Sequence, residues 1–193
     1  MNIEYEATFT NINKDDIRRR LLSVGAVLIK KEFFQKRIVF DLPLSCEIKG
    51  AWLRVRDEGD RITMSLKIVD GQKISDQKEI QLVVDNFQQA VDFLTNIGCK
   101  KKAYQESKRE LWILDEVEIT IDEWPFLESF VEVEGNSEEQ VKIVSEKIGF
   151  DYTTAKFCSV DTLYSEKYGL DIDIINKKTP NILFEMDNPF LLR

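Results

Sequence analysis

The chain of 193 residues contains no histidine, and this absence excludes several kinds of chemistry. Ser-His-Asp and Cys-His catalysis, zinc sites with histidine ligands and imidazole pH switches all need that side chain. Any reaction must therefore use carboxylates, lysine, arginine, hydroxyl groups or a bound metal ion.

Cysteines and long apolar runs are also scarce. Cys46, Cys99 and Cys158 lie far apart and form no CxxC pair, which argues against a disulfide framework or a thiolate metal site. The first residues, Met1 to Glu4, lack the basic and apolar regions of a signal peptide. The apolar runs are well short of the roughly 20 residues that span a bilayer. We expect a cytoplasmic protein with no membrane partner.

The charge balance is acidic, with a formal net charge of −8. Proteins that bind nucleic acid present basic surfaces to the phosphate backbone, so we expect no nucleic-acid partner. Hydrophobic residues make up 43% of the chain and charged residues 32%. This composition permits a substantial core beside a heavily charged surface or cavity.

Three segments carry the signals of amphipathic helices. Asn13 and Asn86 are potential N-caps, and Ser137 opens a capping-box pattern; apolar residues at helical spacing follow each of them. Most of the remaining segments have the pattern of strands. We predict strands at about 2–9, 27–41, 51–57, 61–69, 77–84, 102–114, 116–122 and 127–134, with a further short one at 153–157. Many strands and few helices indicate an α+β protein, and a closed antiparallel β-barrel would leave no bare sheet edges.

Within these strands, apolar and polar residues alternate, so that one face of each strand is polar. One interpretation is an ordinary antiparallel sheet whose polar face lies in water. However, the charges are sorted by strand. Acids share the polar face at Glu4 and Glu6, and basic residues share it at Arg54 and Arg56.

A barrel that turned these faces inward would enclose clustered carboxylates opposite clustered cations. Such a cavity is costly unless it holds ligands that neutralise both groups. A divalent cation bound to an oligophosphate meets this requirement, because Mg²⁺ and Mn²⁺ prefer oxygen ligands while arginine and lysine bind phosphate oxygens. The apolar strand faces would then point outward and be covered by the three helices.

At about residues 2–165 the sequence resembles the CYTH family of triphosphate tunnel enzymes. The family's ExExK motif is similar to Glu4–Thr8, its QxxxYFD strand to Gln35–Asp41, its LRxR element to Leu53–Arg56 and its LTxK strand to Ile62–Lys67. Its KRREVY segment is similar to residues 108–112, its LD piece to 121–122 and its FxExE piece to 130–134. The resemblance implies a closed antiparallel eight-stranded β-barrel with helices packed outside.

Several positions depart from the family pattern. Thr8 replaces the lysine that ends ExExK, Glu128 replaces a glycine, and Ser159-Val160 lacks the tyrosine of a late SY element. Residues 166–193 have no clear counterpart. We therefore expect a barrel domain at 1–165 and a C-terminal extension at 166–193 packed on the same domain.

The resemblance also implies site residues. The expected ligands of Mg²⁺ or Mn²⁺ are Glu4, Glu6, Asp122, Glu132 and Glu134. The expected phosphate-binding residues are Arg54, Arg56, Lys67, Arg109 and Lys156. Of these, the catalytic set comprises Glu4, Glu6, Arg54, Arg56, Lys67 and Arg109.

Three functions remain open from the sequence. The first is a metal-dependent triphosphatase acting on tripolyphosphate, ATP or thiamine triphosphate, with water as the nucleophile. The second is a class IV adenylyl cyclase, in which the 3′-hydroxyl of bound ATP attacks and yields cyclic AMP and pyrophosphate. The third is a binding module that holds a triphosphate or polyphosphate without turnover, which Thr8 favours because a phosphate-contacting charge is missing. We expect a monomer or homodimer.

Overall fold

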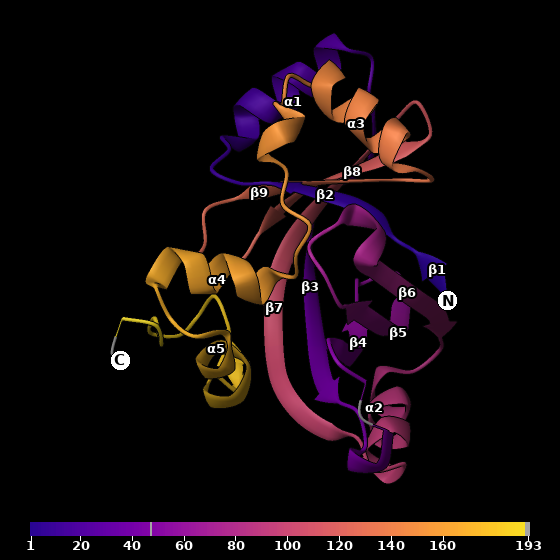
Figure 1. Ribbon diagram of the computed structural model, residues 1–193, viewed down its shortest axis with the longest axis vertical. Helices are drawn as coiled ribbons and strands as arrows, with labels where there is room; N and C mark the ends of the chain where they lie inside the picture. The colour runs from indigo at the N-terminus through magenta and orange to yellow at the C-terminus, as the bar shows by residue number, and fades with distance from the viewer. Residues whose placement is uncertain (47, 192–193) are drawn as a thin grey trace.

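The computed structural model describes residues 1–46 and 48–191 (Figure 1). Within these ranges the helices are α1 (Lys14–Ser23), α2 (Phe87–Asn96), α3 (Glu138–Lys147), α4 (Val160–Tyr168) and α5 (Ile172–Lys178). The strands are β1 (Asn2–Ile3), β2 (Tyr5–Phe9), β3 (Val27–Asp41), β4 (Ala51–Asp57), β5 (Ile62–Val69), β6 (Gln77–Val84), β7 (Lys100–Leu114), β8 (Val117–Glu123), β9 (Phe130–Gly135) and β10 (Asn181–Ile182).

The strands form a nearly closed antiparallel barrel. The order of hydrogen-bonded neighbours is β1-β6-β5-β4-β3-β7-β8-β9-β2, and β10 lies off this path, parallel to β7. Since β1 and β2 are consecutive in the chain, the N-terminal segment bonds to both ends of the path. The fold class is therefore confirmed.

The expected number of eight strands is wrong, because the described residues place nine strands on the path around the barrel. The difference arises at Glu4, which separates β1 from β2. The Glu4 amide donates a hydrogen bond of 2.9 Å to the carbonyl of Gln77. On one side of this residue β1 pairs with β6, and on the other β2 pairs with β9.

All three predicted helices are present, and each begins at its predicted cap. The side chains of Asn13, Asn86 and Ser137 accept hydrogen bonds from backbone amides three residues later, at 3.0, 2.9 and 3.3 Å. These bonds satisfy amides that have no partner within the helix.

The hydrophobic core lies outside the barrel, between the strands and the helices. Figure 1 shows α1 and α3 over β2, β8 and β9, with α2 at the other end beside β4. Outward residues such as Ala7 and Val133 pack with Ile17 of α1 and Val141 of α3. A second cluster joins outward residues of β3 and β4 to α2. The alternation therefore places the apolar faces outward, as predicted, and the charged faces inward.

The C-terminal part contains α4 and α5, which the sequence patterns did not predict. The strand expected at 153–157 is wrong: residues Tyr152–Thr154 form a 3₁₀-helix, and only an isolated bridge joins Thr8 to Lys156. This part also contains the short strand β10. A third apolar cluster joins this part to the barrel. Its buried members are Trp124, Phe130, Leu163, Tyr164, Ile175, Ile182 and Phe190.

The helices of the described residues are short, since the longest span ten residues. None of them has the length and apolar character that crossing a membrane requires.

Candidate functional site

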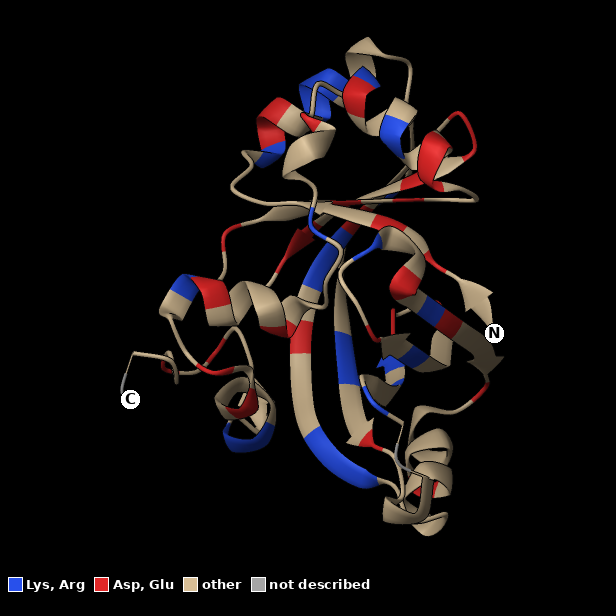
Figure 2. Cartoon of the chain, in the orientation of Figure 1, with Lys and Arg blue, Asp and Glu red and all other residues tan. Residues whose placement is uncertain are grey.

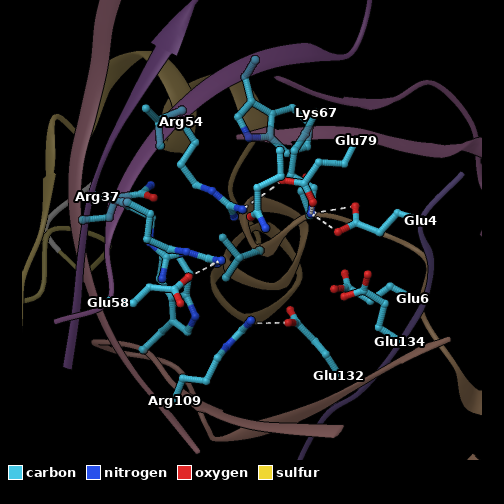
Figure 3. A pocket seen from close by; sticks show the side chains of 18 of the residues that line it. Glu4, Glu6, Arg37, Arg54, Glu58, Lys67, Glu79, Arg109, Glu132 and Glu134 are labelled. Carbon is cyan, nitrogen blue, oxygen red and sulfur yellow. Dashed lines mark hydrogen bonds and ion pairs between the residues drawn. The ribbon is translucent and has the colours of Figure 1, made fainter. Parts of the chain in front are cut away.

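The barrel encloses a cavity of about 600 Å³ lined mainly by charged side chains (Figure 3). Most of its lining residues come from the inward faces of β2 to β9, as the two-residue alternation dictates. Figure 2 shows basic residues along β3 and β7 and acidic residues on β9 and the N-terminal segment. Eight of the ten predicted site residues line the cavity: Glu4, Glu6, Arg54, Arg56, Lys67, Arg109, Glu132 and Glu134.

One wall of the cavity is acidic. Glu4, Glu6 and Glu134 each offer a carboxylate oxygen, and these oxygens lie within 4.8 Å of one another. Glu6 on β2 lies directly opposite Glu134 on β9. Their convergence produces a dense negative potential on this side of the barrel.

Burial and mutual repulsion act on the pKa values of these acids. Burial and the neighbouring Glu132 hold the pKa of Glu6 well above its ordinary value. Burial and Glu4 raise the pKa of Glu134 to about 7. Burial also raises the pKa of Glu4, although Lys67 opposes this. A hard divalent cation would relieve the repulsion, since carboxylate oxygens are the ligands that Mg²⁺ and Mn²⁺ prefer. The donor set therefore fits such an ion.

The opposite wall is basic, and most of its guanidinium groups are held by acids that also lie in the barrel. Arg54 contacts Glu79 at 3.2 Å, and Arg56 contacts Glu58 at 2.5 Å. Burial and the neighbouring Arg54 lower the pKa of Arg56 to about 10. These arginines therefore repel one another across a short distance, and an anion between them would be stabilised.

Arg109 and Lys67 lie where the two walls meet. The Arg109 guanidinium donates hydrogen bonds to Asp122 at 2.8 Å and Glu132 at 2.5 Å. The Lys67 ammonium lies 2.8 Å from the Glu4 carboxylate. Although burial opposes it, the attraction of Glu4 raises the pKa of Lys67. Both cations are thus charged and directed into the cavity.

Two predicted residues lie elsewhere. Asp122 has no exposed surface; it is held by Arg109 and by the Thr120 hydroxyl, which donates to it at 2.6 Å. Lys156 lines a small surface depression instead, and its ammonium pairs with Glu166. The structure therefore places Asp122 behind Arg109 and Lys156 outside the cavity.

Position 8 is also outside the cavity lining. Thr8 is 3% exposed and lies opposite Glu132 in the ladder between β2 and β9. Its backbone forms two hydrogen bonds with Lys156, of 2.9 and 3.0 Å. The side chain that replaces the family lysine therefore carries no charge into the barrel.

Nine charged lining residues lie outside the predicted set: Lys30, Arg37, Glu58, Asp60, Arg61, Glu79, Lys102, Glu118 and Asp161. The alternation could have indicated two of them. Arg37 is two residues from Gln35, which opens the family's QxxxYFD motif, and Glu79 shares a polar face with Gln77 and Gln81. Glu58 follows the end of β4, so no strand periodicity reaches it.

These observations agree with the comparison with protein families. Residues 2–163 match the CYTH domain, so the chain belongs to the CYTH family. The comparison with curated proteins found no match.

Solved structures share the fold at low sequence identity. A conserved hypothetical protein from Pyrococcus furiosus has 18% identity and a TM-score of 0.69, with 83% of this chain and 99% of that one covered. An adenylate cyclase candidate from Vibrio parahaemolyticus has 14% identity and a TM-score of 0.72, with 85% and 98% covered. The adenylyl cyclase candidate HpAC1 from Hippeastrum, described as revealing a dominant triphosphatase activity, has 13% identity and a TM-score of 0.56, with 88% and 99% covered.

Proposed function

We propose that the protein is a metal-dependent phosphohydrolase that binds and hydrolyses an inorganic or organic triphosphate inside its barrel. The observation that carries this proposal is the separation of charge in one cavity, with three converging carboxylates facing a wall of arginines (Figure 3). A metal ion and a polyanion bound together neutralise both walls, whereas either ligand alone leaves one wall unbalanced.

Glu4, Glu6 and Glu134 would hold the Mg²⁺ or Mn²⁺ ion. When bound, such an ion polarises phosphate oxygens as a Lewis acid and offsets their negative charge. Glu132 stands beside this set but bonds to Arg109, so we assign it to orienting that arginine.

Arg54, Arg56, Arg109 and Lys67 would bind the phosphate oxygens. The carboxylates that hold these cations fix their orientation, and each guanidinium keeps further N–H donors for the ligand. Fixed donors aimed at a phosphoryl group stabilise charge that develops during transfer, because they need no reorganisation. With water as the nucleophile the products are a shortened phosphate chain and orthophosphate.

A class IV adenylyl cyclase is the second candidate, and the name of the Vibrio structure favours it. The description of HpAC1 favours the triphosphatase. A binding module without turnover is the third, and it is favoured by the uncharged Thr8.

A panel assay separates these functions. Purified protein is given tripolyphosphate, ATP or thiamine triphosphate with Mg²⁺ or Mn²⁺. Released orthophosphate supports the proposal, and cyclic AMP with pyrophosphate supports the cyclase. Thermal stabilisation without product supports the binding module. No product and no stabilisation with any of the three compounds would exclude all of these functions.

A further inference from the structure

Arg37 on β3 differs from Arg54, Arg56 and Arg109 in that, within the described part of the chain, its hydrogen bonds go only to neutral side chains. It lines the cavity and is 4% exposed. Its guanidinium donates to the Gln35 side-chain oxygen at 2.9 Å and to the Ser107 hydroxyl, and it lies 4.3 Å from the centre of the Trp124 ring. Among residues 1–46 and 48–191, no carboxylate oxygen lies within 4.0 Å of its nitrogens.

The surroundings of Arg37 make this charge unfavourable in the absence of a ligand. Arg56 lies directly opposite it in the ladder between β3 and β4, and like charges at such positions are destabilising. Burial, together with Arg56 and Arg54, holds the pKa of Arg37 well below its ordinary value. The Arg37 Nε atom is buried and has no hydrogen-bond partner. A buried charge normally has a paired counter-ion, so the missing partner points to an anion from outside the protein.

We propose that Arg37 binds the end of the bound polyphosphate that lies farther from the carboxylates of Glu4, Glu6 and Glu134. This inference rests on the proposed function and extends it to a residue that the predicted site does not contain. Figure 3 shows Arg37 on the wall opposite the carboxylates, beside Arg54. A ligand that contacts both walls therefore reaches Arg37 with its far phosphate.

The neutral partners orient this guanidinium without neutralising it. Gln35 and Ser107 hold its Nη2 atom, and the indole of Trp124 covers its plane. Arg37 would act as a phosphate-binding residue on the wall of the barrel that faces the N-terminal strand.

The test compares Arg37→Met with Lys36→Met by isothermal titration of tripolyphosphate, with and without Mg²⁺. Methionine removes the charge and retains much of the length of the side chain. Lys36 is the matched control, because it is the preceding residue, is not in the cavity lining and pairs with Asp57 at 3.3 Å. We expect Arg37→Met to raise the Kd by at least about tenfold and Lys36→Met to change it by less than about twofold. Arg37→Lys should recover part of the lost affinity.

The melting temperature without ligand gives a second readout. Because Arg37→Met removes an unbalanced buried charge, and because Gln35 and Ser107 still bond to each other at 3.1 Å, we expect it to melt at or above the wild-type temperature. A variant that melts lower, or fails to fold, would show that the protein already balances this charge and would overturn the inference. Unchanged tripolyphosphate affinity in Arg37→Met would overturn it too. If instead the wild type binds none of tripolyphosphate, ATP and thiamine triphosphate, the proposed function itself fails.

Discussion

The carboxylate cluster of Glu4, Glu6 and Glu134 should make the metal-free protein less stable as the pH rises from 5 to 8. Glu134 has a pKa of about 7 in the folded protein, against 4.5 for the ordinary side chain. Between these values the folded state retains a proton that the unfolded state has released. Stability is therefore greatest at the acidic end of this window and is lost as the pH rises through it.

The magnitude follows from the size of the shift. One pKa unit corresponds to about 1.4 kcal/mol, so Glu134 accounts for a loss of up to about 3 kcal/mol. Glu6, whose pKa is also raised, adds to the loss with the same sign. Glu79 acts in a different pH range. Burial raises its pKa, but the attraction of Lys67 and Arg54 outweighs burial and lowers the pKa to about 2. Its contribution to stability is therefore lost only as the pH falls below 4.5. The absence of histidine leaves few other groups that titrate between pH 5 and 8.

The measurement is the free energy of unfolding in urea at pH 5, 6, 7 and 8 in the presence of a chelator. Wild type should lose stability across this range, and Glu134→Gln should lose less. Glu146→Gln, an exposed position on α3, is the control and should follow the wild type. Saturating Mg²⁺ or Mn²⁺ should restore stability at pH 8, by about 2.7 kcal/mol at a hundred times the Kd. Equal slopes for wild type and Glu134→Gln would refute the assignment of a repulsive carboxylate cluster.

Three further changes test the site. Arg109→Gln should lower the free energy of unfolding by about 3–5 kcal/mol, since it leaves the buried Asp122 without a cation; a loss below about 1 kcal/mol in urea unfolding would contradict this pairing. Glu4→Gln combined with Glu6→Gln should abolish the dependence of orthophosphate release on Mg²⁺, and activity that still responds to the metal would remove these acids from the site. Thr8→Lys should increase turnover of tripolyphosphate or its affinity, and unchanged kinetics would show that position 8 is not limiting.

Much of the fold could be predicted because its determinants are local. A side-chain period of two fixes which face of a strand is apolar, and Asn13, Asn86 and Ser137 cap their helices through bonds to residues only three positions away. The split of the first strand could not be predicted in the same way. It depends on the bond from Glu4 to Gln77, which are distant in sequence.

The C-terminal helix α4 lacks a comparable local signal at its start. Ser159 precedes α4 but forms no side-chain cap, and the helix is fixed by tertiary contacts such as the 2.6 Å hydrogen bond from the Tyr164 hydroxyl to the Pro125 carbonyl. Similarly, the alternation predicts which candidate residues face inward, but it cannot tell which acids pair with which cations. Asp122 was a predicted metal ligand, and only the structure shows it bonded to Arg109.

The arrangement of this barrel links its stability to its ligands. The apolar contacts that stabilise the fold lie outside the barrel, between strands and helices. The interior therefore does not need apolar side chains and can hold charged ones. That charge is sorted onto two walls, and the repulsion within each wall acts against folding until ligands arrive. Neutralising Arg37 or Glu134, whose shifted pKa values mark charges that the empty barrel disfavours, should therefore stabilise the empty protein while weakening binding. Such a trade-off is expected of a binding site and not of a structural ion-pair network, where loss of a charge destabilises the protein directly.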